Sequence, residues 1–492
     1  MHQTPSRRKE LARRTFVYAL MTLTVIGLVI VLMLLMLGYR FDITKRSVHQ
    51  TGLVQYDSLP RGAMVRVDGE AIRTTKTKST VLPGERQFMM HLEGYEPWQK
   101  TLTIQPETVT YLDYARLVPT KRRVTTMTEL GLVQSARFAP GGQWLVTVSG
   151  SVAAPIVSWT DVRDVKKPKY TTHPLPVAKL LGYDNPDTPH QFTIHEWDTG
   201  ARFVLVKHQY QTADGPKLQW LRLDREKPEE MIDVTTLTGL ALREATFAGT
   251  SGAVLYALQD SGELREINLS QATISVPLIS QVRQFSLYGD QTIAFVSQRD
   301  AVTAAGIWKK GWKQPRMVRT LAANEANLPL TVRASHYFHK DTVAVAVGQT
   351  VTMYRGALGD SDEAMQLLLS KPRNFQFGRP VQALTIGDNG RFVVARDEAG
   401  MMSYDLERLS VSRQIALAPG EQMAWLDSFH LQRRATDGGL VMQEFDGANE
   451  HRLFDNVAFE TAFSSDQRFM LAVTRKDNTF ALQWLALTTE EE

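Results

Sequence analysis

Cysteine is absent from this 492-residue chain, which excludes disulfide bonds, thiol catalysis, thiolate metal sites and a lipidated amino-terminal cysteine. An exported domain of this composition depends on hydrophobic burial and sheet pairing for its stability. Common catalytic and cofactor signatures are also missing: Gly-x-Ser-x-Gly, His-Glu-x-x-His, the phosphate-binding Gly-Lys-Ser/Thr loop, the dinucleotide fingerprint and the EF-hand loop. We therefore expect no catalytic, cofactor-binding or metal-binding residues, no cofactor, and a protein that is not an enzyme.

Charged side chains are missing between Thr15 and Tyr39. The apolar run 16–37 is long enough, at ~1.5 Å per residue, to cross a bilayer as one helix. Five basic residues precede it closely and three follow it, so the positive-inside rule places residues 1–15 in the cytoplasm. We interpret the run as an uncleaved signal anchor in the lipid bilayer of the cell membrane, followed outside by a juxtamembrane linker at 38–51.

A cleaved signal peptide is the competing interpretation of this segment. Its apolar region would cover only ~7–15 residues and end at small side chains, whereas this run is longer and ends in Met-Leu-Gly-Tyr-Arg-Phe. A buried core helix is the weaker alternative, because no amphipathic period is visible.

The formal net charge of +4 is distributed unevenly, with +4 on residues 1–37, +5 on 38–123 and −5 on 124–492. A nucleic-acid-binding protein concentrates Lys and Arg on its large folded part, so we expect no nucleic-acid partner. The basic excess near the membrane fits a solvated surface, or contact with anionic headgroups or wall polymers.

Residues 52–118 alternate between apolar and polar side chains with a period of two, which is typical of half-buried strands. The Asp68-Gly69 dipeptide indicates a tight turn between two of them. No helical period is visible, so a small β-sandwich is expected. Its strands are expected at 52–57, 63–67, 86–92, 98–104 and 108–117.

The segment Pro60-Arg-Gly-Ala-Met-Val-Arg-Val-Asp-Gly69 resembles the PEGA domain signature, Pro-x-Gly-Ala-x-Val-x-Val-Asp-Gly. Leu82-Pro83-Gly84 and Gly94-Tyr95 follow at the corresponding places. The resemblance covers 52–118 and is interrupted only after Ile72, where a loop at 73–79 is expected in place of the family's usual turn. It implies a stalk or wall-contact module of a prokaryotic envelope.

The signature residues have structural explanations. Gly62 and Gly69 permit positive φ at turns, and Val65 and Val67 are expected to face one core. Asp68 is expected to act as a turn residue rather than as a ligand or an acid.

After a short linker at 119–123, one motif recurs through 124–492: an aromatic or aliphatic residue, a turn rich in Gly, Asp, Ser or Asn, and an apolar strand. The copies lie at 137–146, 195–204, 246–255, 286–293, 335–343, 385–393, 424–431 and 462–470. They resemble the Phe-Ser-Pro-Asp-Gly hairpin of TolB-type and WD-type β-propellers, which implies four-stranded blades.

The expected fold is therefore mainly β: a transmembrane helix, a PEGA β-sandwich at 52–118 and a seven- or eight-bladed β-propeller at 124–492. Eight copies favour eight blades, and residues 124–129 are a candidate outer strand for the last one. A pair of β-sandwiches is the alternative architecture. Helices should be scarce, and 362–369 is the one short candidate.

Several residue pairs are possible sites, but each has a simpler explanation. His336 and His339 are expected in one strand, where alternation sends them to opposite faces and makes joint metal binding improbable. Asp360 and Asp362 flank a serine in a loop that suits Ca²⁺, although a solvated acidic turn explains them better.

Other motifs are explained by turns and packing. The segments 388–390 and 213–215 carry hairpin-turn residues. Ser464 and Asp466 form only a fragment of a sialidase-type box. Trp308 and Trp312 are a possible carbohydrate platform, but the tryptophans of 124–492 are expected mainly to pack between sheets.

The sequence thus favours an extracytoplasmic binding or scaffold protein of the cell envelope whose propeller engages a protein or a cell-wall glycan. An exported enzyme with its site in the propeller channel, and a purely structural envelope protein, remain alternatives.

Overall fold

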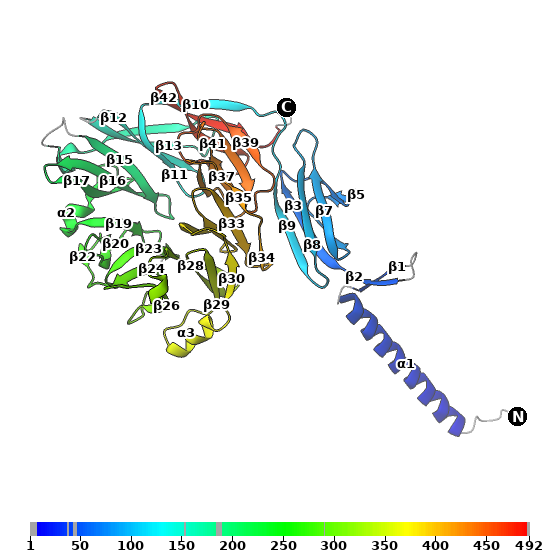
Figure 1. The fold of residues 1–492 in the computed structure, drawn as a ribbon. Coiled ribbons are helices and arrows are strands. Elements are labelled where there is room, and N and C mark those ends of the chain that lie inside the picture. The colour runs from blue at the N-terminus through cyan, green and yellow to red at the C-terminus, as the bar shows by residue number, and fades with distance from the viewer. Residues whose placement is uncertain are drawn as a thin grey trace. The chain divides into compact units, whose positions relative to one another are not determined.

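The computed structural model describes residues 7–36, 39–42, 47–151, 154–183, 189–289 and 291–489. They form two compact units. One holds the described residues up to Lys121 together with Thr488 and Thr489, and the other spans Arg122–Leu487. The fold is mainly β, as expected (Figure 1).

The amino-terminal helix α1 (Arg7–Met36) contains the apolar run. Its segment Leu11–Leu34, 24 residues long, is by length and composition sufficient to cross a membrane, and none of it is buried. The described part of the linker 38–51 forms a hairpin of β1 (Tyr39–Asp42) and β2 (Ser47–Gln50), in which Tyr39 pairs with Gln50.

The sandwich in the first unit has seven strands. One sheet has the order β6-β3-β9, with β3 and β9 parallel, and the other has the order β5-β4-β7-β8. The strands are β3 (Gly52–Leu59), β4 (Met64–Val67), β5 (Glu70–Thr74), β6 (Thr77–Val81), β7 (Gly84–His91), β8 (Trp98–Ile104) and β9 (Val109–Arg116).

The prediction of a loop at 73–79 is wrong, because the strands β5 and β6 occupy most of this segment. Both are edge strands with little buried surface, so they lack the apolar alternation that reveals a strand. The buried Thr75 between them holds this edge, since its hydroxyl contacts Ser58 Oγ at 2.7 Å and accepts from the Gly62 N–H at 3.0 Å.

The signature residues play the structural parts that were expected. Gly62 and Gly69 have φ of 93° and 87°, and Val65 and Val67 are buried. The Asp68 carboxylate accepts from the Gln87 N–H and from Arg86, which lower the pKa of Asp68.

The second unit consists of eight successive antiparallel sheets, which we number as blades 1 to 8. Blade 1 comprises β11 (Val133–Phe138), β12 (Trp144–Ser151), β13 (Ala154–Asp161) and β14 (Lys169–Pro174); blade 2, β15 (His190–Trp197), β16 (Phe203–Thr212), β17 (Gly215–Asp224) and β18 (Ile232–Asp233); blade 3, β19 (Leu242–Phe247), β20 (Val254–Gln259), β21 (Leu264–Asn268) and β22 (Thr273–Ile274); blade 4, β23 (Val282–Tyr288), β24 (Thr292–Arg299), β25 (Val302–Lys309) and β26 (Arg316–Thr320).

Blades 5 to 8 repeat this order. Blade 5 comprises β27 (Leu330–Tyr337), β28 (Lys340–Val347), β29 (Thr350–Gly356) and β30 (Arg373–Gln376); blade 6, β31 (Ala383–Ile386), β32 (Phe392–Arg396), β33 (Gly400–Asp405), β34 (Ser410–Val411) and the additional β35 (Ile415–Ala416); blade 7, β36 (Gln422–Trp425), β37 (His430–Arg434), β38 (Leu440–Glu444) and β39 (His451–Phe454); blade 8, β40 (Ala462–Phe463), β41 (Phe469–Lys476), β42 (Thr479–Ala486) and β10 (Val124–Gly131).

Strand β10 closes the ring, because it pairs with β42 as the outer strand of blade 8. This pairing confirms the prediction that residues 124–129 belong to the outer strand of the last blade. The eight sheets confirm the expected eight-bladed propeller. All eight sequence copies lie at the hairpin that joins the first two strands of a blade. At one of them Gly142 has φ of 63°, and a Cβ there would lie 1.7 Å from the Phe463 carbonyl oxygen of blade 8.

Helices are scarce in the described part of this unit. The predicted helix is confirmed as α3 (Asp362–Leu369), whose amino-terminal cap is Ser361. The sequence did not indicate α2 (Val234–Thr238) or the 3₁₀ turns at Val177–Lys179 and Ala323–Glu325.

Candidate functional site

The middle hairpin of blade 2 forms one wall of a groove between blades 2 and 3. Its strands β16 and β17 have 10 residues each and are joined by Ala213 and Asp214. The hairpin turn expected at 213–215 is thereby confirmed, with Gly215 at φ 109°. Residues Gln209, Tyr210, Lys217 and Leu218 of this hairpin face the groove.

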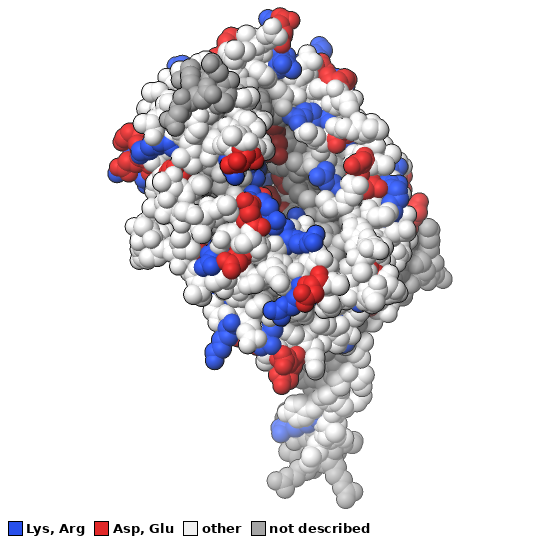
Figure 2. Space-filling model, turned by 60° about the vertical axis from the view of Figure 1, so that its left-hand side comes forward, with Lys and Arg blue, Asp and Glu red and all other residues white. Residues whose placement is uncertain are grey.

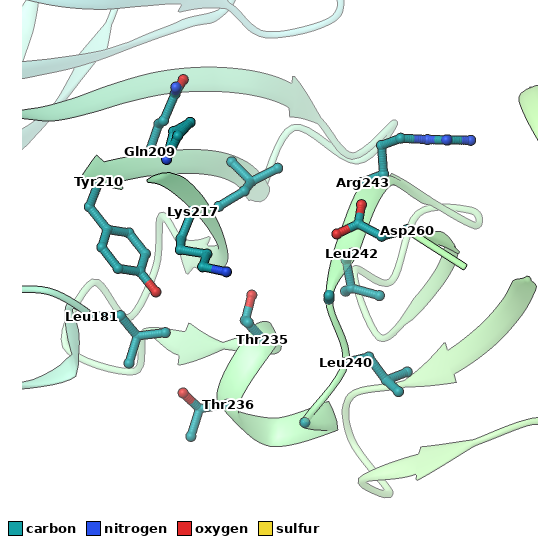
Figure 3. A pocket seen from close by; sticks show the side chains of 14 residues that line it. Leu181, Gln209, Tyr210, Lys217, Thr235, Thr236, Leu240, Leu242, Arg243 and Asp260 are labelled. Atoms are coloured by element: carbon teal, nitrogen blue, oxygen red, sulfur yellow. The ribbon is translucent and has the colours of Figure 1, made fainter. Parts of the chain in front are cut away.

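The opposite wall is α2 together with the segment that leads into β19. Asp233 caps α2 by accepting from the Thr236 N–H, and Gly239 ends the helix in the left-handed region at φ 65°. This places Thr235, Thr236 and the following segment across from Lys217 (Figure 3).

The groove has a volume of about 710 Å³. Lys217 and Asp260 enter it from opposite sides (Figure 3). Neither side chain has an ion-pair or hydrogen-bond partner in the described parts of the chain, so both charges remain available to a ligand.

Two further side chains of the groove are held in place. The Arg243 guanidinium donates to the carbonyls of Val282 and Arg283 in blade 4, at 3.2 and 2.8 Å. The Tyr210 ring stacks on the His208 ring with their centroids 5.3 Å apart, and burial and the charge of Asp233 raise the pKa of the Tyr210 phenol.

A buried polar network lies behind the hairpin wall. His190 Nδ1 is 2.9 Å from His208 Nε2, and His208 Nδ1 is 2.7 Å from Gln219 Oε1. The Gln219 amide donates in turn to Asp233 Oδ2 at 2.8 Å, which connects the histidine pair to the cap of α2. Burial lowers the pKa of His208 to about 4.

An ion-pair cluster lies below the groove. The Glu244 carboxylate on β19 accepts from His195 Nε2 at 3.1 Å and contacts Lys207 Nζ at 3.5 Å. Burial acts to raise the pKa of Glu244, but its hydrogen bond with His195 and the charge of Lys207 outweigh burial and lower the pKa. His195 and Lys207 both lie against the buried Trp220 ring.

The neighbouring Glu196 joins blades 2 and 3. Its carboxylate accepts from the Phe247 N–H at 2.5 Å and from the Thr246 hydroxyl at 3.0 Å. Burial raises the pKa of Glu196. With both oxygens engaged by blade 3, Glu196 has a clear structural use.

The fold places the two histidines of one candidate pair in different elements, and the two aspartates of the other pair beside an arginine. His336 lies in β27, which ends at Tyr337, but His339 lies in the following turn with φ of 62°, so the expectation of one shared strand is wrong. Asp360 and Asp362 both contact Arg316, through Asp362 Oδ1 at 2.6 Å and through the Asp360 carbonyl. Within the described ranges, no group of three or more His, Cys, Asp or Glu side chains is placed to hold a metal ion.

The remaining candidates are structural. Trp308 is buried and Trp312 packs beside it, so these two side chains do not form the exposed platform that carbohydrate binding would need. Ser464 and Asp466 bond to each other at 2.6 Å in the first hairpin of blade 8. The turn expected at 388–390 connects β31 and β32.

The groove residues were not found from the sequence. The strands around Ala213-Asp214 are longer than those of the other blades, at 10 residues each, but their polar residues next to the turn give no apolar run that reveals this length. Asp260 carries no local signal, because only the fold brings it opposite Lys217.

The groove presents charges of both signs, hydroxyl groups and apolar side chains to a ligand. Acidic and basic side chains are also interspersed over the face of the protein in Figure 2, which is hollowed near its centre. No large area of that face carries charges of one sign only, as binding of a polyanion would require.

Comparison with protein families supports the PEGA resemblance of the β-sandwich in the first unit. Residues 51–120 match the PEGA domain family. The search of curated proteins found no match. Among solved structures, an oligogalacturonate lyase in complex with manganese is similar at 12% identity and a TM-score of 0.41, over 75% of this chain and 98% of that chain.

Proposed function

We propose that this chain is a single-pass, membrane-anchored protein of the cell envelope whose TolB/WD-type propeller binds a protein or wall-glycan partner in the groove between blades 2 and 3. The observation that carries the proposal is the groove itself, with Lys217 and Asp260 on its two sides and no partner for either among the described residues. Pockets that combine apolar lining with a few polar groups are typical of ligand sites.

The anchor and the PEGA domain support an envelope location. Helix α1 contains a segment with the length and composition of a membrane span, and five basic residues precede its apolar run, against three just after it. Protease added to intact cells should cleave the propeller, and protection of the propeller until lysis would contradict this topology.

Binding is tested with the full-length protein in lipid nanodiscs, incubated with isolated envelope proteins and, separately, with purified wall glycan. We expect retention of a partner by the wild type and its loss in Tyr210→Ala/Lys217→Ala. Tyr170→Ala/Lys340→Ala is the matched control, since both side chains are exposed away from the groove. Equal retention by both variants would contradict the proposal.

An exported enzyme is the second candidate, favoured by the contact between His195 and Glu244 at 3.1 Å. Such a pair is suited to general acid–base chemistry. Catalysis would release fragments from the envelope material in excess of the protein added, and His195→Ala would abolish that release.

A further inference from the structure

The outer edge of β17 is largely uncovered. Strand β18 pairs with it only at Leu221 and Arg222, so the segment 215–220 has no outer neighbour strand among the described residues. This segment borders the groove, with α2 on the other side. An uncovered edge of this kind presents backbone donors and acceptors to an extended peptide.

The direction of these backbone groups follows from one hydrogen bond. The Trp220 N–H donates to Thr235 Oγ1 at 2.8 Å, so it points away from β16 and toward α2. Backbone groups alternate in direction along a strand, so the N–H and carbonyl of Leu218 and the carbonyl of Pro216 point the same way. The wall of the groove therefore has the Leu218 N–H as a main-chain donor and the carbonyls of Pro216 and Leu218 as main-chain acceptors.

The charges of the groove narrow the ligand class. A neutral glycan would leave Lys217 and Asp260 partly desolvated and unpaired, which costs free energy. A uniform polyanion would pair with Lys217 but would meet the carboxylate of Asp260. A peptide with an acidic and a basic side chain satisfies both.

We propose that the groove binds an extended peptide segment, which pairs with the edge of β17 at Leu218 and places an acidic side chain near Lys217 and a basic one near Asp260. This inference rests on the proposed function and selects a protein over a glycan as the partner. Pro216 has no N–H and the Trp220 N–H is already used, so the pairing is short and centred on Leu218.

The test uses a display library of random nine-residue peptides, selected on the full-length protein in nanodiscs. Selected peptides are synthesised, and their affinities are measured for the wild type, Leu218→Pro and Leu218→Ala. Leu218→Pro removes the N–H that points into the groove, whereas Leu218→Ala keeps it. Singly N-methylated peptides supply a second test that leaves the protein unchanged.

We expect Leu218→Pro to weaken binding about tenfold, as loss of one or two main-chain hydrogen bonds predicts. An N-methyl group on the peptide nitrogen that donates to the edge of β17 at Leu218 should weaken binding equally. Leu218→Ala should stay within about threefold. Selection on Lys217→Glu should no longer enrich acidic residues. Peptides that bind Leu218→Pro and the wild type equally, or that tolerate every N-methyl group, would overturn the inference.

Failure of the inference can be separated from failure of the proposed function. If no library peptide binds, but wall glycan is retained by the wild type and lost in Tyr210→Ala/Lys217→Ala, the groove is a binding site and the peptide inference is wrong. If no envelope material depends on the groove, both are wrong.

Discussion

Blades 2 and 6 are built from the same repeat but differ in how the third strand is covered. In blade 6, the six-residue β33 is paired at both ends, by β34 and by β35. In blade 2, the ten-residue β17 is paired by β18 at only two residues. The outer strands are equally short, so part of β17 is uncovered because β17 is longer than β33 and has one outer strand instead of two.

The two blades also share an ion pair with different burial. Arg391 binds Asp405 in blade 6, where both side chains are nearly inaccessible, 6% and 4% exposed. Arg202 binds Asp224 at the same place in blade 2, but Arg202 is 37% exposed. The equivalent ion pair is therefore shielded from solvent in blade 6 and partly exposed to solvent in blade 2.

The largest expected effect is loss of the buried pair in blade 6. Asp405→Asn should lower the free energy of unfolding by about 3 kcal/mol, because it removes the bidentate partner of the buried Arg391 guanidinium, which is left with Glu407 alone. Asp224→Asn, the matched change, should cost only about 1 kcal/mol. Urea unfolding followed by circular dichroism measures both, and equal losses would show that burial does not distinguish the blades.

The second effect depends on pH and concerns His208 of blade 2. The pKa of His208 is about 4 in the fold, against ~6.5 when unfolded. The unfolded chain therefore binds the proton first, and stability present above pH ~6.5 is lost as the pH falls toward 4. The loss from this group is about 3 kcal/mol.

His208→Gln should remove most of this pH dependence, measured as the change in unfolding free energy between pH 7 and pH 4. A variant with the same pH dependence as the wild type would contradict the assignment to His208.

A smaller effect is expected at the cap of α2. Asp233→Ala should cost about 1 kcal/mol, because Asp233 accepts from the Thr236 N–H and from Gln219. Asp233→Asn can still cap the helix and is the control. Thermal unfolding should rank the wild type and Asp233→Asn above Asp233→Ala, and the reverse order would be inconsistent with capping.

The smallest effect on stability is expected at Lys217. Lys217→Ala should change the free energy of unfolding by less than about 0.5 kcal/mol, since the side chain is exposed and unpaired among the described residues. Its effect on partner binding should be much larger. A large loss of stability would assign Lys217 a structural part instead.

Much of the fold was predictable because it depends on local patterns. The Pro60–Gly69 signature identified the sandwich, and the recurring hairpins identified the blades and the closing strand. The edge strands β5 and β6 were missed, because a strand with little buried surface carries no alternation. The groove was missed because Lys217 and Asp260 are brought together by neighbouring blades, not by spacing in the chain.

The central claim is that the groove between blades 2 and 3 is occupied by a partner in the envelope. The most direct test replaces Tyr210 with a photoreactive amino acid in growing cells, with the exposed Leu367 of α3 as the control position. We expect a discrete cross-linked species from position 210 and none from position 367. No adduct at 210, or the same adducts at both positions, would contradict the central claim.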